Sequence, residues 1–127
     1  EEKNMNYIKK LREVKPLVHN ITNYVTVNDV ANAILAIGGS PIMSDEITEV
    51  AQMTSISNAL NINIGTLNQV KIASMFEAGK ASNACQHITV LDPVGAGATD
   101  LRTNTCKELL EQIHFDAIKG NISETCS

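Results

Sequence analysis

The sequence has 127 residues, of which 43% are hydrophobic and 19% charged, so it can form one domain with a buried core and is not disordered. Aromatic residues make up 3% and Trp is absent, so that core must be aliphatic. The net charge of −4 and a pI near 5.3 argue against nucleic acid or an anionic membrane as the main partner, although a small anionic ligand remains compatible.

Strand-like and helix-like segments alternate along the chain. A short amphipathic helix is expected over Asn4–Val14, ended by Pro16. Strands are expected, in chain order, at Leu17–Val18, Ser40–Met43, Ala59–Ile64, Ile88–Leu91 and Phe115–Ile118. Helices are expected at Val25–Ile37, Ile47–Ile56, Leu67–Ala84, Leu101–Ile113 and from Ile122 onward, and the first of these reads as mostly buried. This alternation is typical of right-handed βαβ units and predicts one α/β unit with a mostly parallel sheet.

The unusual polar and glycine-rich groups all lie at or just after the carboxyl ends of predicted strands. They are Met43 to Asp45, Asn63 to Thr66, Asp92 to Ala98 and Lys119 to Glu124. Ligands of open parallel sheets bind outside the carboxyl ends of the strands. The sequence therefore predicts a ligand site at that edge. A polar stretch, Asn20 to Asn23, interrupts the chain between the first strand and the next helix, where Thr22 or Asn23 is a natural helix N-cap.

The stretch LDPVGAGATD, residues 91–100, joins a strand to a helix through a glycine-rich loop. Such a loop can turn backbone N–H groups toward an anion at a helix N-terminus. It lacks the third glycine of GxGxxG and the Gly-Lys-Ser/Thr of a P-loop. Gly95 and Gly97 are equally explained by a tight turn that requires positive φ.

Asp92 ends one strand and Glu124 follows the next strand along the chain. If those strands pair, the two carboxylates lie at one edge of the sheet, and this donor set suits Mg²⁺ bridging nucleotide phosphates. Taken singly, Asp92 is also explained as a turn acid and Glu124 as an acid in the first turn of a helix. Their coincidence with the glycine loop favours the metal.

Three cysteines, Cys85, Cys106 and Cys126, show no Cys-x-x-Cys spacing. Neither a disulfide framework nor a zinc site is expected, and reduced thiols in the cytoplasm fit best. No stretch approaches the roughly 20 apolar residues of a membrane span.

Four runs together resemble the hydroxyethylthiazole kinase family of the ribokinase-like superfamily: PLVHNITNYVTVNDVANAILAIGGSPIMSDE, NIGTL, LDPVGAGATDLRT and KGNISE. They cover nearly the whole chain from Pro16 onward. The resemblance implies a three-layer α/β/α ribokinase-like fold. It also implies transfer of the ATP γ-phosphate to 4-methyl-5-(2-hydroxyethyl)thiazole in thiamine salvage, a requirement for Mg²⁺ and a cytoplasmic homotrimer.

The resemblance also assigns roles to individual residues. The thiazole site would be lined by Asn23, Val25 and Met43, with Gly65 and Thr66 nearby as further substrate-binding residues. Asp92 and Glu124 would serve the Mg²⁺–phosphate end, with Glu124 as the acid of an Asn-x-x-Glu motif that begins at Asn121. Lys119 and Asn121 would contact ATP. The family usually carries Arg at the position of Lys119, and lysine keeps the charge without the bidentate fork.

The resemblance further implies that residues 1–127 are the N-terminal half of a single kinase domain, apparently truncated. The catalytic base and the glycine-rich anion hole of the family would lie in the other half, so no catalytic residue is expected here and this chain alone is expected to be inactive. Two alternatives remain open. One is a non-catalytic half-domain that binds a ligand or a partner. The other is a related kinase such as a hydroxymethylpyrimidine kinase, against which the HNITN and PIM runs argue.

Overall fold

A parallel β-sheet organises residues 9–22 and 27–119, the part of the chain that the computed structural model describes. Its strands are β1 (Leu17–Ile21), β2 (Ser40–Met43), β3 (Ala59–Asn63), β4 (Ile88–Asp92) and β5 (Ala117–Ile118). They lie in the order β2-β1-β3-β4-β5, and each neighbouring pair is parallel. The predicted α/β fold with a parallel sheet is thereby confirmed.

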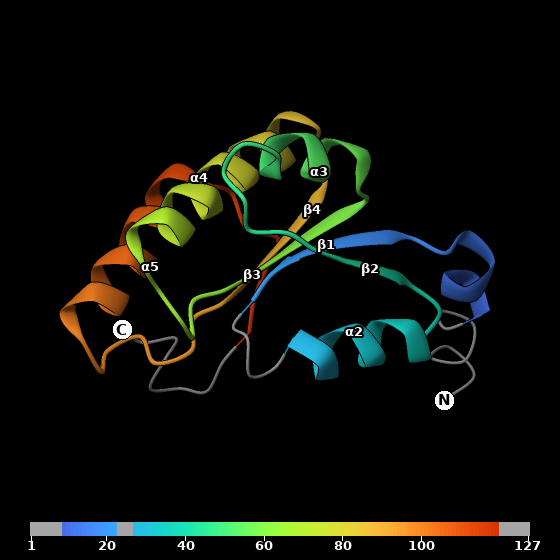
Figure 1. Cartoon of the computed structure of the whole chain (residues 1–127), viewed down its shortest axis with the longest axis horizontal. Coiled ribbons are helices and arrows are strands. Elements are labelled where there is room, and N and C mark those ends of the chain that lie inside the picture. Colours follow the sequence, from blue (N-terminus) through green and yellow to red (C-terminus); the bar gives the residue numbers. More distant parts are fainter. Residues whose placement is uncertain (1–8, 23–26, 120–127) are drawn as a thin grey trace.

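Helices cover both faces of this sheet, which makes three layers (Figure 1). Helix α2 (Val27–Ala36) connects β1 to β2 on one face. The helices on the other face are α3 (Val50–Ile56), α4 (Gln69–Ala84) and α5 (Asp100–Gln112). A helical segment at residues 9–14 precedes β1. None of the helices in the described ranges combines the length and the apolar content needed to cross a membrane.

The hydrophobic core lies between the sheet and the α3–α4–α5 layer. Period-2 alternation in β3 directs Leu60 and Ile62 to this face, where both are fully buried. Met75 of α4 and Leu109 of α5 pack against them from above. The core is aliphatic, as the scarcity of aromatic residues predicts.

Strand β1 is longer than the sequence indicated, because Asn20 and Ile21 belong to it rather than to a polar interruption. β1 has hydrogen-bonded neighbours on both sides, with Asn20 opposite Met43 in β2 and Asn61 in β3. The Asn20 side-chain amide donates to the Val18 carbonyl at 3.0 Å, so this polar group is satisfied inside the strand. Tertiary pairing here overrides the weak strand propensity of Asn.

A helix is present in the region predicted at residues 25–37, but the prediction that it is mostly buried is wrong. None of the α2 residues, Val27 to Ala36, is buried, and Leu35 is 58% exposed. The apolar stripe rests on one face of the sheet, where the only helix near α2 among the described residues is the short segment at residues 9–14, at the C-terminal end of α2 (Figure 1). The predicted stop is confirmed, since Gly38 adopts a φ of +102° and its N–H donates to the Leu35 carbonyl.

Other boundaries move by a few residues. Helix α3 begins at Val50 rather than Ile47, after a turn at residues 47–49. Strand β5 begins at Ala117 rather than Phe115 because Asp116 bonds to Thr89 instead, through its backbone N–H and its carboxylate, each at 2.8 Å. The helix expected from Ile122 lies outside the described residues.

Candidate functional site

The strand order places a topological switch point between β1 and β3. The chain leaves β1 toward α2 on one face and leaves β3 toward α4 on the other, so a crevice opens outside the carboxyl ends of these two strands. The same edge carries the ends of β2, β4 and β5. The fold therefore gathers at one edge the described residues of the segments that the sequence singled out.

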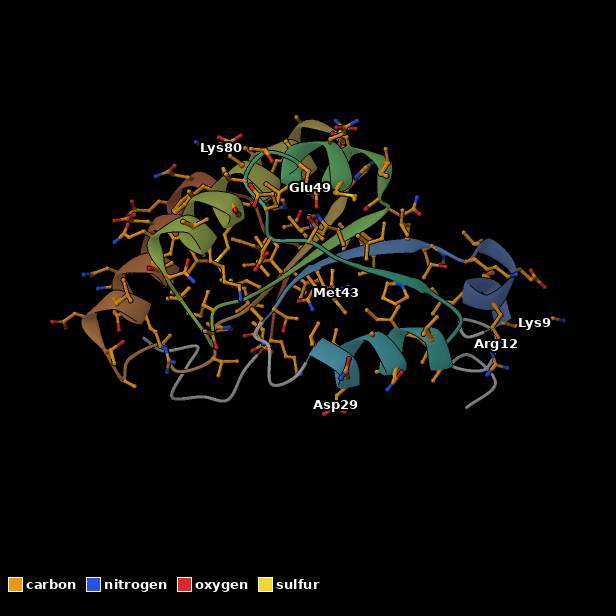
Figure 2. The ribbon with its side chains drawn as sticks, in the orientation of Figure 1. Lys9, Arg12, Asp29, Met43, Glu49 and Lys80 are labelled. Carbon is orange, nitrogen blue, oxygen red and sulfur yellow. The ribbon has the colours of Figure 1, made fainter. Side chains whose placement is uncertain are left out.

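A pocket of about 110 Å³ lies at the ends of β1 and β2. Its lining residues are Asn20, Thr22, Val27, Met43, Ser44 and Asp45. Figure 2 shows Met43 between the end of the sheet and α2. Met43, predicted to contact an apolar ring, thus lines a pocket that combines a soft thioether with amide, hydroxyl and carboxylate groups.

Asn20 forms a buried polar wall of this pocket. It is 1% exposed, and its Oδ1 accepts a hydrogen bond from Asn61 Nδ2 at 3.2 Å. Its amide nitrogen donates to the carbonyls of Val18 and, at 3.5 Å, Ile42. The amide is therefore held by three strands and its orientation is preset. Sequence reasoning passed over Asn20 as part of a polar interruption.

The loop that follows β2 is anchored to the core by His19. The ring Nε2 of His19 lies 2.8 Å from the Ser44 carbonyl, and Nδ1 lies 2.8 Å from Thr54 Oγ1. Because a carbonyl only accepts, Nε2 carries the proton and Nδ1 accepts from the Thr54 hydroxyl. Burial lowers the pKa of His19, and the Ser44 hydrogen bond and the Glu49 carboxylate partly oppose that shift. His19 is thus a neutral link between β1 and the pocket loop.

A second cluster surrounds Asp92 at the end of β4. Lys119 Nζ lies 3.9 Å from Asp92 Oδ2, and Asn63 Nδ2 donates to the same oxygen at 3.4 Å. The pairing of β4 with β5 brings Lys119 here, because its backbone N–H donates to the Leu91 carbonyl. Two of the predicted nucleotide-end residues, Asp92 and Lys119, are therefore neighbours.

Asn63 connects this cluster to the turn after β3. Its Oδ1 accepts from the Gly65 N–H at 2.7 Å while its Nδ2 faces Asp92. Gly65 is half-buried and Thr66 is exposed, and neither lines the Met43 pocket. The structure thus joins Gly65 to the Asp92 cluster and leaves Met43 two strands away.

The glycine loop forms two successive turns. Ala96 N–H donates to the Pro93 carbonyl and Ala98 N–H to the Gly95 carbonyl, each at 3.0 Å. The N–H of Gly97 donates to Thr103 Oγ1 at 2.9 Å. Gly95 and Gly97 have φ of +77° and +94°, so the requirement for positive φ is confirmed. These three amides are used within the loop and its helix, so they do not form a cradle for an anion in this arrangement.

Arg102 supplies a cationic group at this edge that the sequence analysis missed. Its Nη2 donates to the Gly65 carbonyl at 2.7 Å, and its side chain lies where a Cβ on Gly95 would be. Glycine at position 95 therefore lets the guanidinium cross the loop and reach the β3 turn. The signal available in the sequence was a lone arginine in the first turn of the helix after the glycine loop.

The residues at the Asp92 cluster fit a divalent cation of the hard type. Mg²⁺ is usually held by one or two carboxylates together with substrate phosphates and water. Asp92 supplies one carboxylate with a side chain only 17% exposed. Within residues 9–22 and 27–119 there is no group of three or more His, Cys, Asp or Glu side chains suited to an all-protein metal cage. A shared protein–phosphate site is thus the arrangement that these donors suit.

Four of the predicted site residues lie outside the described residues. They are Asn23, Val25, Asn121 and Glu124.

A three-layer parallel sheet with a pocket at the ends of β1 and β2, beside its switch point, and a carboxylate–cation cluster at the end of β4 defines the class of this chain. It is an α/β protein with its candidate ligand site along the carboxyl edge of the sheet.

Comparison with known proteins specifies that class further. The model of the hydroxyethylthiazole kinase family matches residues 8–127. A hydroxyethylthiazole kinase from Clostridium acetobutylicum is 57% identical over 117 residues, which are 92% of this chain and 43% of the relative. One from Clostridium tetani is 58% identical over 119 residues, with 94% and 43% covered. The chain belongs to the hydroxyethylthiazole kinase family.

A solved structure is also similar to this chain. The structure of a hydroxyethylthiazole kinase from Pyrococcus horikoshii OT3 matches with a TM-score of 0.94 and 43% identity, over 99% of this chain and 49% of that one. The chain therefore spans less than half the length of the relatives it matches.

Proposed function

We propose that this chain is the N-terminal half of a single kinase domain that transfers the γ-phosphate of ATP to the hydroxyl of 4-methyl-5-(2-hydroxyethyl)thiazole, a step of thiamine salvage. The observation that carries the proposal is one sheet edge with an acceptor-like pocket at Met43 and a carboxylate–cation cluster at Asp92. Membership of the hydroxyethylthiazole kinase family supports the choice of the thiazole alcohol as acceptor.

At the acceptor end, the proposal assigns the thiazole to Asn23, Val25 and Met43, with Gly65 and Thr66 further along the same sheet edge. The Met43 thioether covers the apolar face of the ring, since a polarisable sulfur packs well on an aromatic surface. The buried amide of Asn20 presents fixed polar groups beside it. A preset wall of this kind lowers the entropy lost on binding.

At the phosphate end, the proposal assigns ATP to Lys119 and Asn121 and Mg²⁺ to Asp92 and Glu124. Bound Mg²⁺ would neutralise charge that develops on the transferring phosphoryl group. Lys119 and Arg102 contribute cationic groups at the same edge, and Asn63 holds the Asp92 carboxylate in place. The group that deprotonates the acceptor alcohol is proposed to lie in the other half of the domain.

The proposal extends to the whole protein. We propose that the whole protein forms a homotrimer in the cytoplasm and that residues 1–127 alone are inactive. Support for the inactivity is that the chain covers only 43% of its kinase relatives. Support for the compartment is that Cys85 and Cys106 are free thiols, which persist in a reducing environment.

A combined mass and activity measurement tests this proposal. The natural reading frame that contains these residues is expressed, its intact mass is measured, and ATP-dependent phosphorylation of the thiazole alcohol is assayed beside the hydroxymethylpyrimidine alcohol. We expect a mass well above 13.7 kDa and phosphorylation of the thiazole alone. A protein of 13.7 kDa with full activity would contradict the division into halves. Turnover of the pyrimidine alone, or of neither alcohol, would contradict the substrate.

A further inference from the structure

Lys71 is the buried charged residue of α4. Its neighbours in the buried stripe of that helix are Ser74, Met75, Ala78, Gly79 and Ser82, at the spacing of a helix face turned to a core. Lys71 is 2% exposed, at a position where this spacing predicts an apolar side chain. Taking an ammonium group out of water is costly, so a buried lysine requires specific partners.

Those partners are two segments of the pocket wall. Lys71 Nζ donates to the Thr22 carbonyl, at the end of β1, at 2.7 Å. The same nitrogen lies 3.9 Å from Asp45 Oδ2, in the loop after β2. Thr22 and Asp45 both line the Met43 pocket, so one side chain joins two strand ends from behind the wall.

Ser74, one turn further along α4, holds the same loop at a second point. Its hydroxyl donates to the Asp45 carbonyl at 2.7 Å, and Ser74 is fully buried. A side chain and a backbone carbonyl of one loop residue are thus both bonded to the core face of α4. Burial lowers the pKa of the Lys71 amino group, and the Asp45 carboxylate partly opposes that shift.

We propose that Lys71, together with Ser74, is a positioning residue. It fixes the wall of the acceptor pocket that Thr22 and Asp45 form, and thereby sets the affinity for the acceptor alcohol. The role in acceptor affinity rests on the proposed function, whereas the fixing of the wall rests on the contacts of Lys71 and Ser74 alone. A fixed pocket wall is important for turnover because a displacement of about 1 Å in a group that positions the substrate can lower the rate on the order of 100-fold.

The test uses Lys71→Met in the full-length protein. Methionine keeps the length of the side chain and removes the amino group, and Asp45 does not become a buried lone charge because its side chain is 41% exposed. Ser74→Ala is the milder second variant. Lys80→Met removes a charge from the outward face of α4 (Figure 2), and Ser82→Ala removes a buried hydrogen bond of α4 to Thr89, away from the pocket.

Two readouts separate the parts of the proposal. Hydrogen exchange of peptides covering residues 44–50 is expected to quicken by roughly tenfold or more in Lys71→Met, and less in Ser74→Ala, because local opening becomes easier. The KM for the thiazole alcohol is expected to rise by roughly tenfold or more, with a smaller change in the KM for ATP. Neither control variant is expected to change exchange at residues 44–50 or the acceptor KM.

Unchanged exchange at residues 44–50 in Lys71→Met would overturn the proposal, as would an equal effect in Ser82→Ala. Faster exchange with an unaltered acceptor KM would overturn the role in affinity. If Lys71→Met does not fold, Ser74→Ala decides by the same two readouts. If the wild-type protein does not phosphorylate the thiazole alcohol, the proposed function fails, and hydrogen exchange alone decides whether Lys71 fixes the wall.

Discussion

Asn63 joins two functional segments of the sheet edge through one side-chain amide. Its Oδ1 accepts from Gly65 and its Nδ2 donates to Asp92, so both ends of the amide are used. Because the Gly65 N–H can only donate, the amide has one satisfactory orientation, and that orientation presents a donor to the carboxylate. A carboxylate that serves a cation is commonly held by such a neighbour.

Asn63→Asp tests this role at nearly constant size. The new carboxylate still accepts from Gly65 but loses the donor and repels Asp92. We expect kcat/KM of the full-length protein to fall by roughly 10- to 100-fold, the usual loss when a group that supports a metal ligand is changed. Steady-state kinetics against Mg²⁺ concentration measures it.

Asn83→Asp is the matched control. Asn83 exchanges hydrogen bonds with the backbone of His114 through both ends of its amide, at the opposite edge of the sheet. An equal loss of activity in Asn83→Asp would show that the Asn63 effect is one of stability alone.

His19 makes the stability of the molecule depend on pH. Its pKa is lowered in the folded state by burial, so below about pH 6.5, the ordinary histidine value, the unfolded chain binds more protons than the folded one. The His19 contribution to the unfolding free energy is therefore complete above that pH. It declines as the pH falls, by at most about 1.4 kcal/mol per pH unit for one proton.

Urea unfolding of wild type and His19→Gln between pH 7.5 and 5 measures this dependence. The difference in unfolding free energy between the two proteins is expected to shrink steadily as the pH falls. Parallel curves for wild type and His19→Gln would contradict the role of His19.

At the scale of elements, α4 determines how the core layer packs. Gly79 lies mid-helix and is buried, and a Cβ there would overlap Cδ1 of Ile113, the residue that follows α5. The glycine costs helix propensity of about 1 kcal/mol relative to alanine, and in return α5 can end close against α4. Close packing, rather than a turn, explains this glycine.

Gly79→Ala is accordingly expected to destabilise the protein, despite the better helix former. We expect a loss of about 1–3 kcal/mol in unfolding free energy from overpacking. Ile113→Val removes the overlapping methyl group, so the double variant should recover part of the loss, and a double-mutant cycle in urea measures that coupling. Additive single effects would contradict the contact.

Element boundaries show where sequence patterns stop being informative. The spans of β2 and the order of strands and helices follow from periodicity and from breakers such as Gly38, which are local signals. β1 was underestimated because Asn20 is a poor strand former whose amide is satisfied only by Asn61 and the neighbouring backbone. The length of β5 was overestimated because the Asp116 carboxylate accepts the Thr89 N–H, so the strand pairing with β4 begins only at Ala117.

At the scale of the whole molecule, the two sheet faces differ. One face is covered by α3, α4 and α5, whereas the described residues on the other side are α2 and, at its C-terminal end, the short helical segment at residues 9–14 (Figure 1). β5 is an edge strand of the described sheet, and Ile118 on it is 47% exposed. Open strand edges and uncovered apolar side chains favour association.

Residues 1–127 expressed alone are therefore expected to self-associate in sedimentation velocity. Ile118→Lys should reduce that association because it places a charge on the β5 edge. Ile56→Lys, at a residue of α3 that is 62% exposed, is the matched control and should have less effect. A stable monomer at high concentration would contradict the expectation.

The sequence by itself determined the α/β class, the parallel sheet and the edge at which polar groups gather, because these follow from hydrophobic periodicity and from the residues that end strands. It also singled out Met43, the last residue of a predicted strand, and Asp92 and Lys119, which directly follow predicted strands, as candidate site residues. Only the tertiary structure decided which of them are neighbours. Strand order, which no local pattern encodes, puts Lys119 beside Asp92 and leaves Met43 in a separate pocket.

Arg102 and Lys71 emerged only from the structure for the same reason, and so did the partners of Asn63, which the sequence had placed at the predicted ligand edge. Each acts through partners distant in sequence: 29 residues separate Asn63 from Asp92, 37 separate Arg102 from Gly65 and 49 separate Lys71 from Thr22. Their residue types are ordinary for a strand end, a helix start and a helix face. Their roles depend on the partners that the fold brings into contact with them.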